Sequence, residues 1–220
     1  MIDIRWDWIW EHLDDVGEKT YQHLQLLVIP MVAGFLVALA LAILALRQPR
    51  SIGPITALTG LLYTIPSLAA FAVLIPITGL SMLTAIIPLT MYTLLILYVN
   101  TVAGLRSVPP DVNEAADAMG YAPGSRLLRV QLPLALPLIF AGIRIAAVTT
   151  IGLVTVSAII GGNRFGGLGQ FITEGLQTDF DTKIYLGAVG SVVLALSVDA
   201  ALVALQRRLT PWAQRRAGTA

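Results

Sequence analysis

Long apolar runs constrain this chain more than any other feature of its sequence. Leu24 to Leu46 carries no charge, and comparable runs cover residues 52–80, 82–104, 134–160 and 183–205. A helix needs about 20 apolar residues to cross a hydrocarbon core of about 30 Å. The sequence therefore predicts an all-α integral membrane protein with five transmembrane helices.

The composition supports this class and removes several others. Hydrophobic residues make up 56% of the chain and charged residues 12%, whereas charged residues are roughly 25% of a soluble domain. The sequence has no basic face outside the ends of the apolar runs, so nucleic-acid binding is not expected. The chain has no cysteine and only two histidines, His12 and His23, too few for a membrane-embedded metal site or a nucleophile–base set. We therefore expect no enzyme activity and no cofactor in this chain.

Basic residues near the ends of the runs predict the orientation, because loops rich in Lys and Arg stay in the cytoplasm. With five spans, nine arginines fall on one side and four basic residues on the other. The first set is Arg47, Arg50, Arg106, Arg126, Arg129, Arg207, Arg208, Arg215 and Arg216, and the second is Arg5, Lys19, Arg164 and Lys183. The N-terminus is expected outside and the C-terminus inside.

The apolar runs and the charged ends of the chain divide it into three parts. Residues 1–19 are an extracytoplasmic or interfacial segment, residues 20–206 the membrane domain and residues 207–220 a basic cytoplasmic tail. Trp6 and Trp10 recur at helical spacing, and tryptophan favours the membrane–water interface. A short interfacial helix is therefore expected before the first span.

Prolines and glycines predict irregular places within this plan. In the run 52–80, Pro54 is expected at the start, Pro66 at a kink and Pro76 at the end, because membrane helices tolerate proline where neighbours satisfy the freed carbonyls. Residues 161–182 are rich in glycine and too polar to span. This segment is interpreted as a close-packed re-entrant turn or a flexible loop.

Residues 111–133 form the longest polar interruption between the apolar runs. Asp111 stands at a natural N-cap, and Glu114 three residues later completes a capping box. Gly120 is a good helix terminator, and a second short helix is expected from Pro123 to Pro133. The residues alone leave two interpretations open: a capped loop between spans, or a helix that docks on another protein.

The spacing in this stretch resembles the EAA loop of permeases of binding-protein-dependent ABC importers. Glu114-Ala115-Ala116 is followed after three residues by Gly120, and after nine more by Val130-Gln131-Leu132-Pro133, where the family pattern has isoleucine at the first of these four positions. In that family the loop is a coupling helix that docks on the ATPase. The resemblance implies ATPase coupling for Glu114, Ala115, Ala116, Gly120, Leu132 and Pro133, and a type-1 ABC transmembrane domain over 20–206.

Three further stretches are similar to permeases for quaternary-ammonium osmoprotectants such as glycine betaine, choline and carnitine. They are residues 61–80, 132–152 and 157–177. The chain departs from those relatives at Asn163-Arg164-Phe165, which lengthens the turn before Gly166. The resemblance implies a translocation path for such a solute. Importers of amino acids or other small polar solutes are the alternative, and a standalone channel or secondary carrier, which needs no docking helix, is the alternative from another class.

The resemblance also implies partners and a location. The expected partners are separate ATPase chains that carry ATP and Mg²⁺, a second permease chain, identical or related, and an extracytoplasmic solute-binding protein. The expected location is a bacterial inner membrane, as a multi-pass protein in contact with lipid.

Arg144 and Asp199 are charges deep inside expected spans, at similar depth. An ion pair would lower the cost of both charges, and the alternatives are a role in the pathway or separate snorkelling to the interface. Tyr63, Ser67 and Tyr92 are candidate pathway residues, since aromatic faces attract a quaternary ammonium. Their plainer interpretation is helix packing and hydroxyl bonds to the backbone.

Overall fold

The computed structural model describes residues 4–212, and within that range every regular element is a helix. The elements are α1 Trp6–Glu11, α2 Leu13–Arg47, η1 Pro49–Ser51, α3 Ile52–Thr64, α4 Ser67–Thr78, α5 Met82–Arg106, α6 Pro110–Ala118, α7 Pro123–Arg126, η2 Leu127–Gln131, α8 Leu132–Gly161, α9 Gly169–Thr178 and α10 Asp181–Leu209. Four described helices are long and apolar enough to cross a membrane, or up to five when a bent pair counts as one span. The predicted all-α membrane fold is confirmed, while its orientation stays a prediction.

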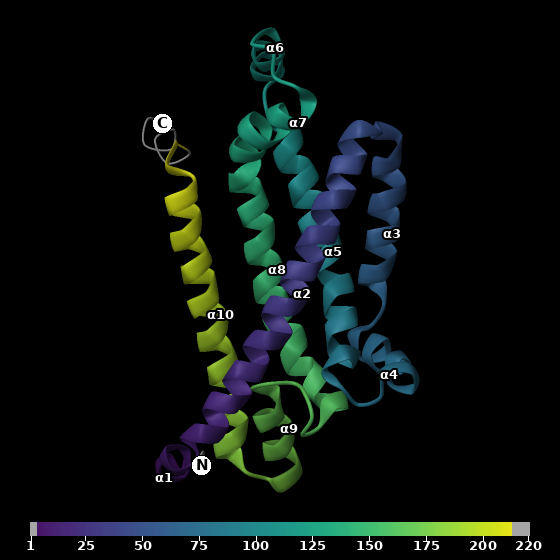
Figure 1. The fold of residues 1–220 in the computed structure, drawn as a ribbon. Helices are drawn as coiled ribbons and strands as arrows, with labels where there is room; N and C mark the ends of the chain where they lie inside the picture. The colour runs from purple at the N-terminus through teal and green to yellow at the C-terminus, as the bar shows by residue number, and fades with distance from the viewer. Residues whose placement is uncertain (1–3, 213–220) are drawn as a thin grey trace.

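The helices form an elongated bundle with α5 near its middle (Figure 1). In the view of Figure 1, α2 runs diagonally across the front, α3 and α4 lie at one side and α10 at the other. Helix α6 stands beyond one end of the bundle, here called the α6 end. Helices α1 and α9 lie at the opposite end, here called the α9 end.

Small residues let α2 and α5 approach closely. Gly34 of α2 is buried, and a Cβ at this position would lie 1.9 Å from Oγ1 of Thr93 on α5. The alanines Ala38, Ala42 and Ala45 continue the same contact, all fully buried. Lipid tails are as apolar as leucine, so close van der Waals packing between small residues is what holds such helices together.

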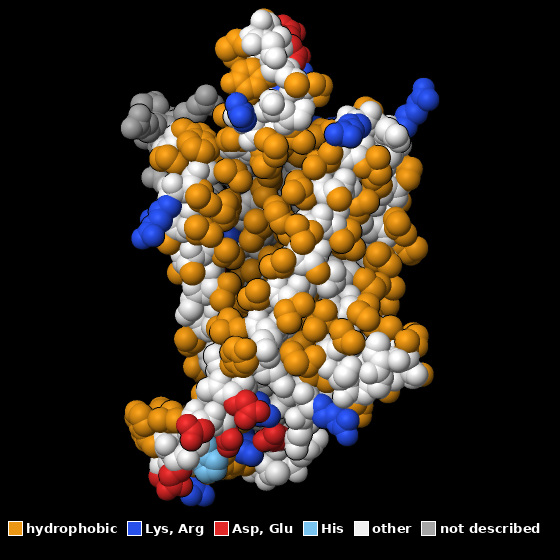
Figure 2. Space-filling view, in the orientation of Figure 1, with side chains coloured by type: hydrophobic (Ala, Val, Ile, Leu, Met, Phe, Trp, Pro, Cys, Tyr) orange, Lys and Arg blue, Asp and Glu red, His pale blue; other side chains and the backbone are white. Residues whose placement is uncertain are grey.

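Charged side chains gather at the two ends of the bundle, and hydrophobic side chains cover the middle (Figure 2). Basic side chains lie at the α6 end, and a group of acidic side chains lies at the α9 end near the start of α2. A mostly apolar band between two charged ends is typical of a protein that spans a bilayer.

The second apolar run does not form one kinked helix as predicted. Helices α3 and α4 meet at 87°, so the run turns a right angle at Ile65 and Pro66. Pro66 has no N–H to continue α3, and the residue before a proline is pushed to extended backbone, which Ile65 adopts. Pro76 lies inside α4, which ends at Thr78 with Gly79 as its C-cap, so the expected end at Pro76 is two residues too early.

The first membrane helix begins earlier than the sequence indicated. Helix α2 starts at Leu13, whereas the apolar run suggested a start at Leu24. Its polar first turns bond α9 and the turn before it, through Lys19 to Gln170 and through Gln22 to the Gly167 N–H. The predicted short N-terminal helix exists as α1, and Trp6 and Trp10 are both exposed on it. The predicted basic tail lies largely outside the described residues, including Arg215 and Arg216, and α10 carries Arg207 and Arg208 in its last turn.

Phe165 occupies a place in the core that the sequence did not suggest. The turn 163–165 was interpreted as an outer extension, yet the Phe165 side chain is fully buried with Leu26, Phe71, Leu89 and Val154. These residues come from α2, α4, α5 and α8, so a single aromatic ring joins four helices at the α9 end.

Replacing Phe165 by alanine should therefore lower the stability of the α9 end. Removing a fully buried phenylalanine costs roughly 3–5 kcal/mol of unfolding free energy, through lost contacts and the cavity left behind. Leu176→Ala is the matched control, since Leu176 is 68% exposed on α9 and its loss should change the free energy by less than about 0.5 kcal/mol. Thermal unfolding of the purified protein in one detergent measures both, and equal unfolding temperatures would contradict the assigned role of Phe165.

Candidate functional site

The projecting helix α6 carries most of the residues that the EAA resemblance singled out. Glu114 and Ala115 are exposed on α6, and Gly120 is exposed directly after it. Ala116 differs, because its side chain is fully buried beneath the helix. Leu132 and Pro133 are half-buried at the start of α8, away from the projecting tip. The structure thus offers Glu114, Ala115 and Gly120 as surface, and Ala116 as support for that surface.

The predicted capping box at the start of α6 is wrong. The helix begins at Pro110 with Pro109 as its N-cap, and no side chain caps it. Proline suits the first position because its missing N–H would be unsatisfied there anyway. Asp111 therefore lies inside the first turn, where a negative charge still favours the positive end of the helix dipole.

Gly120 ends α6 as predicted, and the geometry shows how. Its φ is +81°, in the left-handed region that side chains disfavour. The N–H of Gly120 donates to the carbonyl of Asp117 at 2.9 Å, and the N–H of Tyr121 donates to that of Ala116 at 3.1 Å. This bond pair is the Schellman motif, which satisfies the last carbonyls of a helix and turns the chain sharply.

Two side-chain bonds hold α6 on the segment that follows it. Asp117 forms an ion pair with Arg126 of α7, and Gln131 Nε2 donates to Oδ1 of Asn113 at 2.9 Å. Helix α6 is only nine residues long, too short to persist alone in water. These ties, with the buried Ala116, keep it folded at the tip of the bundle.

The segment after α6 is not a separate surface helix ending at Pro133 as predicted. Helix α7 continues through η2, a π-helical turn, directly into α8, so that residues 123–161 form one helix. Pro133 lacks the N–H that a regular helix needs, and the turn before it takes the wider π register. The coupling candidates at both ends of the motif therefore belong to one connected unit.

The structure brings the two deep charges together. Arg144 of α8 bonds Asp199 of α10 through both carboxylate oxygens, at 2.7 Å from Nε and 2.9 Å from Nη2. Both side chains remain about one-third exposed. They line an open groove of about 470 Å³ between α8 and α10, with Thr149 and apolar neighbours. A lone charge at this depth costs about 2.5–3.5 kcal/mol, so pairing is the favourable arrangement.

The candidate pathway residues lie around the right-angle break between α3 and α4. The rings of Tyr63 and Tyr92 meet edge to face, with centroids 6.0 Å apart. The Tyr92 hydroxyl donates to the carbonyl of Ile65 at 2.6 Å, the position where Pro66 interrupts the helix. Ser67 begins α4 and is half-buried. Tyr92 thus has the packing and hydroxyl-bonding role that was the plainer interpretation, and Tyr63 remains exposed beside it.

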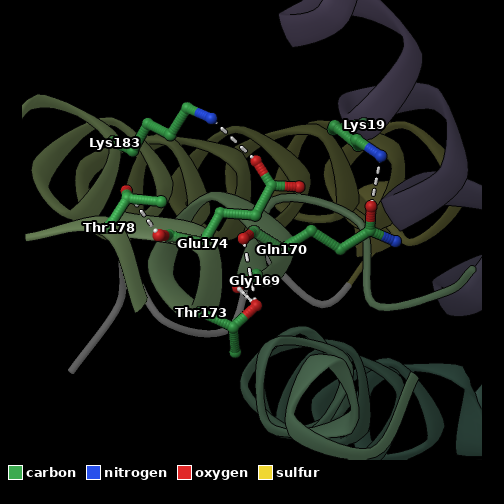
Figure 3. A network of polar contacts seen from close by, with 7 residues as sticks. All are labelled: Lys19, Gly169, Gln170, Thr173, Glu174, Thr178 and Lys183. Carbon is green, nitrogen blue, oxygen red and sulfur yellow. Dashed lines mark hydrogen bonds and ion pairs between the residues drawn. The ribbon is translucent and has the colours of Figure 1, made fainter. Parts of the chain in front are cut away.

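A polar network at the α9 end was missed by the sequence analysis. Helix α9 is held between two lysines, Lys19 of α2 on Gln170 and Lys183 of α10 on Glu174 at 3.0 Å (Figure 3). Gln22 of α2 receives the Gly167 N–H at 3.0 Å and the Gln170 amide at 2.7 Å. Segment 161–182 is therefore packed against α2 and α10, as the first of the two interpretations expected, while its position in the membrane stays a prediction. The available signal was its content of Gln and Glu at helical spacing.

The fold is similar to that of solved transporter permeases. A chain of the methionine ABC transporter MetNI, in an inward-facing conformation, matches with a TM-score of 0.77 over 94% of this chain and 100% of that chain, at 22% identity. Another crystal form of the same transporter matches with a TM-score of 0.75 over 87% of this chain and 94% of that one, at 23% identity. At this identity the likeness establishes the fold, that of an ABC importer permease.

Sequence comparison adds the family. Residues 31–211 match the family of binding-protein-dependent transport system inner membrane components, and the chain belongs to this family. It is 36% identical to the choline transport system permease protein OpuBB of Bacillus subtilis, over 90% of both chains. It is 38% identical to a carnitine transport permease protein OpuCB of Listeria monocytogenes over 90% of both chains, and 35% identical to the osmoprotectant import permease OsmW of Salmonella typhimurium over 90% of this chain and 95% of that one. The chain is thus a non-enzymatic transport component with several membrane spans, and ATP hydrolysis belongs to a separate chain.

A substitution at Gly120 should loosen α6 without any steric clash. No atom lies within 4 Å of a Cβ built there, so Gly120→Ala pays only for the left-handed backbone, roughly 1–2 kcal/mol. Amide exchange of α6 should rise about tenfold. Gly124→Ala is the matched control, because Gly124 also has open space but does not have a positive φ. Exchange measured by mass spectrometry should separate the two variants, and unchanged α6 protection in Gly120→Ala would exclude the Schellman motif as the element that ends the helix.

Proposed function

We propose that the chain forms the translocation path of an ATP-driven importer for small quaternary-ammonium osmoprotectants, of the glycine betaine, choline and carnitine type. The observation that carries the proposal is the similarity to permeases named for these solutes, along nearly the full length of both chains. The methionine transporter is matched at 22–23% identity, which argues only for the fold. An amino-acid substrate therefore has weaker support.

Helix α6, with the turn at Gly120 that ends it, is the proposed contact with the ATPase. Its exposed face presents Glu114, Ala115 and the 69%-exposed Met119 on a helix that stands clear of the bundle. Small and flexible apolar side chains beside one carboxylate suit a groove on another protein, because backbones can then approach closely while the charge fixes the register. The ATP and Mg²⁺ of the transport cycle belong, in this proposal, to that partner chain.

The remaining partners follow from the size of the chain and its family. Four or five spans are few for a complete solute pathway, and in this proposal a second permease chain completes it. An extracytoplasmic solute-binding protein would deliver the solute at the α9 end. In the predicted orientation, with the N-terminus outside, the α6 end faces the cytoplasm. The proposed membrane is the inner membrane of a bacterium. A standalone channel or carrier would not need a projecting helix such as α6 for docking.

Uptake in cells tests the substrate class. A strain without other osmoprotectant uptake systems, given this permease with its ATPase and binding protein, should accumulate labelled glycine betaine, choline or carnitine at high osmolarity. The same strain with labelled methionine serves as the control for the alternative substrate class. Accumulation of methionine without any quaternary amine would overturn the proposed substrate.

Glu114 tests the proposed coupling contact. Glu114→Gln removes one charge from the exposed face of α6, and losing a charge-assisted hydrogen bond at an interface should lower uptake about tenfold. Asp111→Asn is the matched control, because Asp111 is an exposed acid of the same helix outside the Glu-Ala-Ala motif. Uptake and co-purification of the ATPase are measured together. Equal losses in both variants would mean that overall charge, and not Glu114, matters.

A further inference from the structure

The Arg144–Asp199 pair differs from the other ion pairs of residues 4–212 in its place along the helices. The pairs Arg5–Asp7, Asp117–Arg126 and Glu174–Lys183 lie near the two ends of the bundle. Arg144 is twelve residues into α8, about 18 Å along the helix, and Asp199 is ten residues before the end of α10, about 15 Å. This pair is therefore deep within the span.

The pair is also accessible. The Arg144 side chain is 37% exposed and that of Asp199 31% exposed, on the wall of the groove between α8 and α10. Charges at such depth face a water-filled cavity or another protein and not lipid tails. The groove volume of about 470 Å³ falls within the range of about 300–1,000 Å³ that small-molecule sites occupy.

The chemistry of the groove matches a zwitterion that carries a quaternary ammonium. The guanidinium of Arg144 has the planar fork that binds a carboxylate through two hydrogen bonds, as it now binds Asp199. A trimethylammonium group has no N–H to donate, so it needs a negative charge next to apolar surface. Asp199 supplies the charge, and Ile145 and Val148 supply apolar surface in the same groove.

We propose that the Arg144–Asp199 pair is a solute site in the translocation path, where a zwitterionic quaternary-ammonium solute exchanges partners with the pair. Its carboxylate binds Arg144 and its ammonium binds Asp199. Removing one partner from an ion pair this deep in the span leaves an uncompensated charge, which is costly, whereas a zwitterion replaces both partners at once. The inference rests on the proposed function for its class of solute.

Choline provides the contrast that makes the site testable, because it has the ammonium but no carboxylate. Binding of choline uses Asp199 and leaves Arg144 without a partner. Arg144→Gln should therefore lower glycine betaine uptake about tenfold and spare choline, and Asp199→Asn should lower choline uptake at least as much as glycine betaine uptake. In Asp199→Asn the Arg144 fork can still bind the carboxylate of glycine betaine, so choline uptake should fall more than glycine betaine uptake. The two variants should therefore move the ratio of glycine betaine to choline uptake in opposite directions.

The measurement uses the complete transporter, with its ATPase and binding protein, in liposomes. Each ratio is taken relative to that of the unchanged transporter with the same binding protein, so the preference of the binding protein cancels. The matched control is the double variant Lys183→Gln/Glu174→Gln, which removes another interhelical pair, outside the groove and at the α9 end. This control should leave the ratio unchanged.

A double variant keeps the test decisive if the single variants fail to assemble. Arg144→Gln/Asp199→Asn leaves no unpaired charge in the span, so it should assemble with the ATPase and hydrolyse ATP. It should nevertheless lose uptake of both solutes about tenfold or more. Uptake at the unchanged level, or loss of the second permease chain from the complex, would overturn the site, the latter by showing that the pair is a contact between chains.

The proposed function and this site fail in different ways. If the unchanged transporter takes up neither solute, the proposed substrate class is wrong whatever the variants do. If it takes up both, and all three groove variants preserve the ratio and the rate, the site alone is wrong.

Discussion

The cost of leaving a polar group unpaired in hydrocarbon determines most of this structure. Every backbone N–H and C=O in the membrane must find a partner, so the chain crosses as helices. Where Pro66 interrupts one of them, the Tyr92 hydroxyl bonds the Ile65 carbonyl beside the break. Most charged side chains of residues 4–212 lie toward the two ends for the same reason (Figure 2). The single deep pair, Arg144 with Asp199, obeys the rule by compensating each charge with the other.

The two ends of the bundle, where polar side chains are allowed, are built differently. At the α9 end, Phe165 joins four helices and a set of glutamine and lysine side chains fastens α9 to α2 and α10 (Figure 3). At the α6 end, one short helix stands free of the bundle and depends on two side-chain bonds and one buried alanine. The first end is closely packed, and the second is the surface proposed to contact the ATPase.

The spans and the end of α6 at Gly120 were predictable, and the reasons are physical. Apolar runs of span length have few alternatives, and Gly120 at a helix end needs a left-handed backbone that few other residues adopt. The places where the sequence misled were set by contacts between distant segments. Phe165 stands in a polar turn but packs against helices more than 70 residues away, and α2 begins at Leu13 because its polar turns contact α9. The predicted cap at Asp111 was wrong because the helix starts two residues earlier, at Pro110 with Pro109 as its N-cap.

The unbroken helix from Pro123 to Gly161 has a mechanical consequence. Its first turns are bonded to α6, and its middle carries Arg144. One helix therefore connects α6 with the groove between α8 and α10 (Figure 1). Because α6 is tied to the first turns of this helix, a displacement of α6 would act on the same helix that carries Arg144. The π-helical turn at Leu127–Gln131 has wider hydrogen-bond spacing than the regular helix on either side. It lies between the turns that are tied to α6 and the turn that carries Arg144.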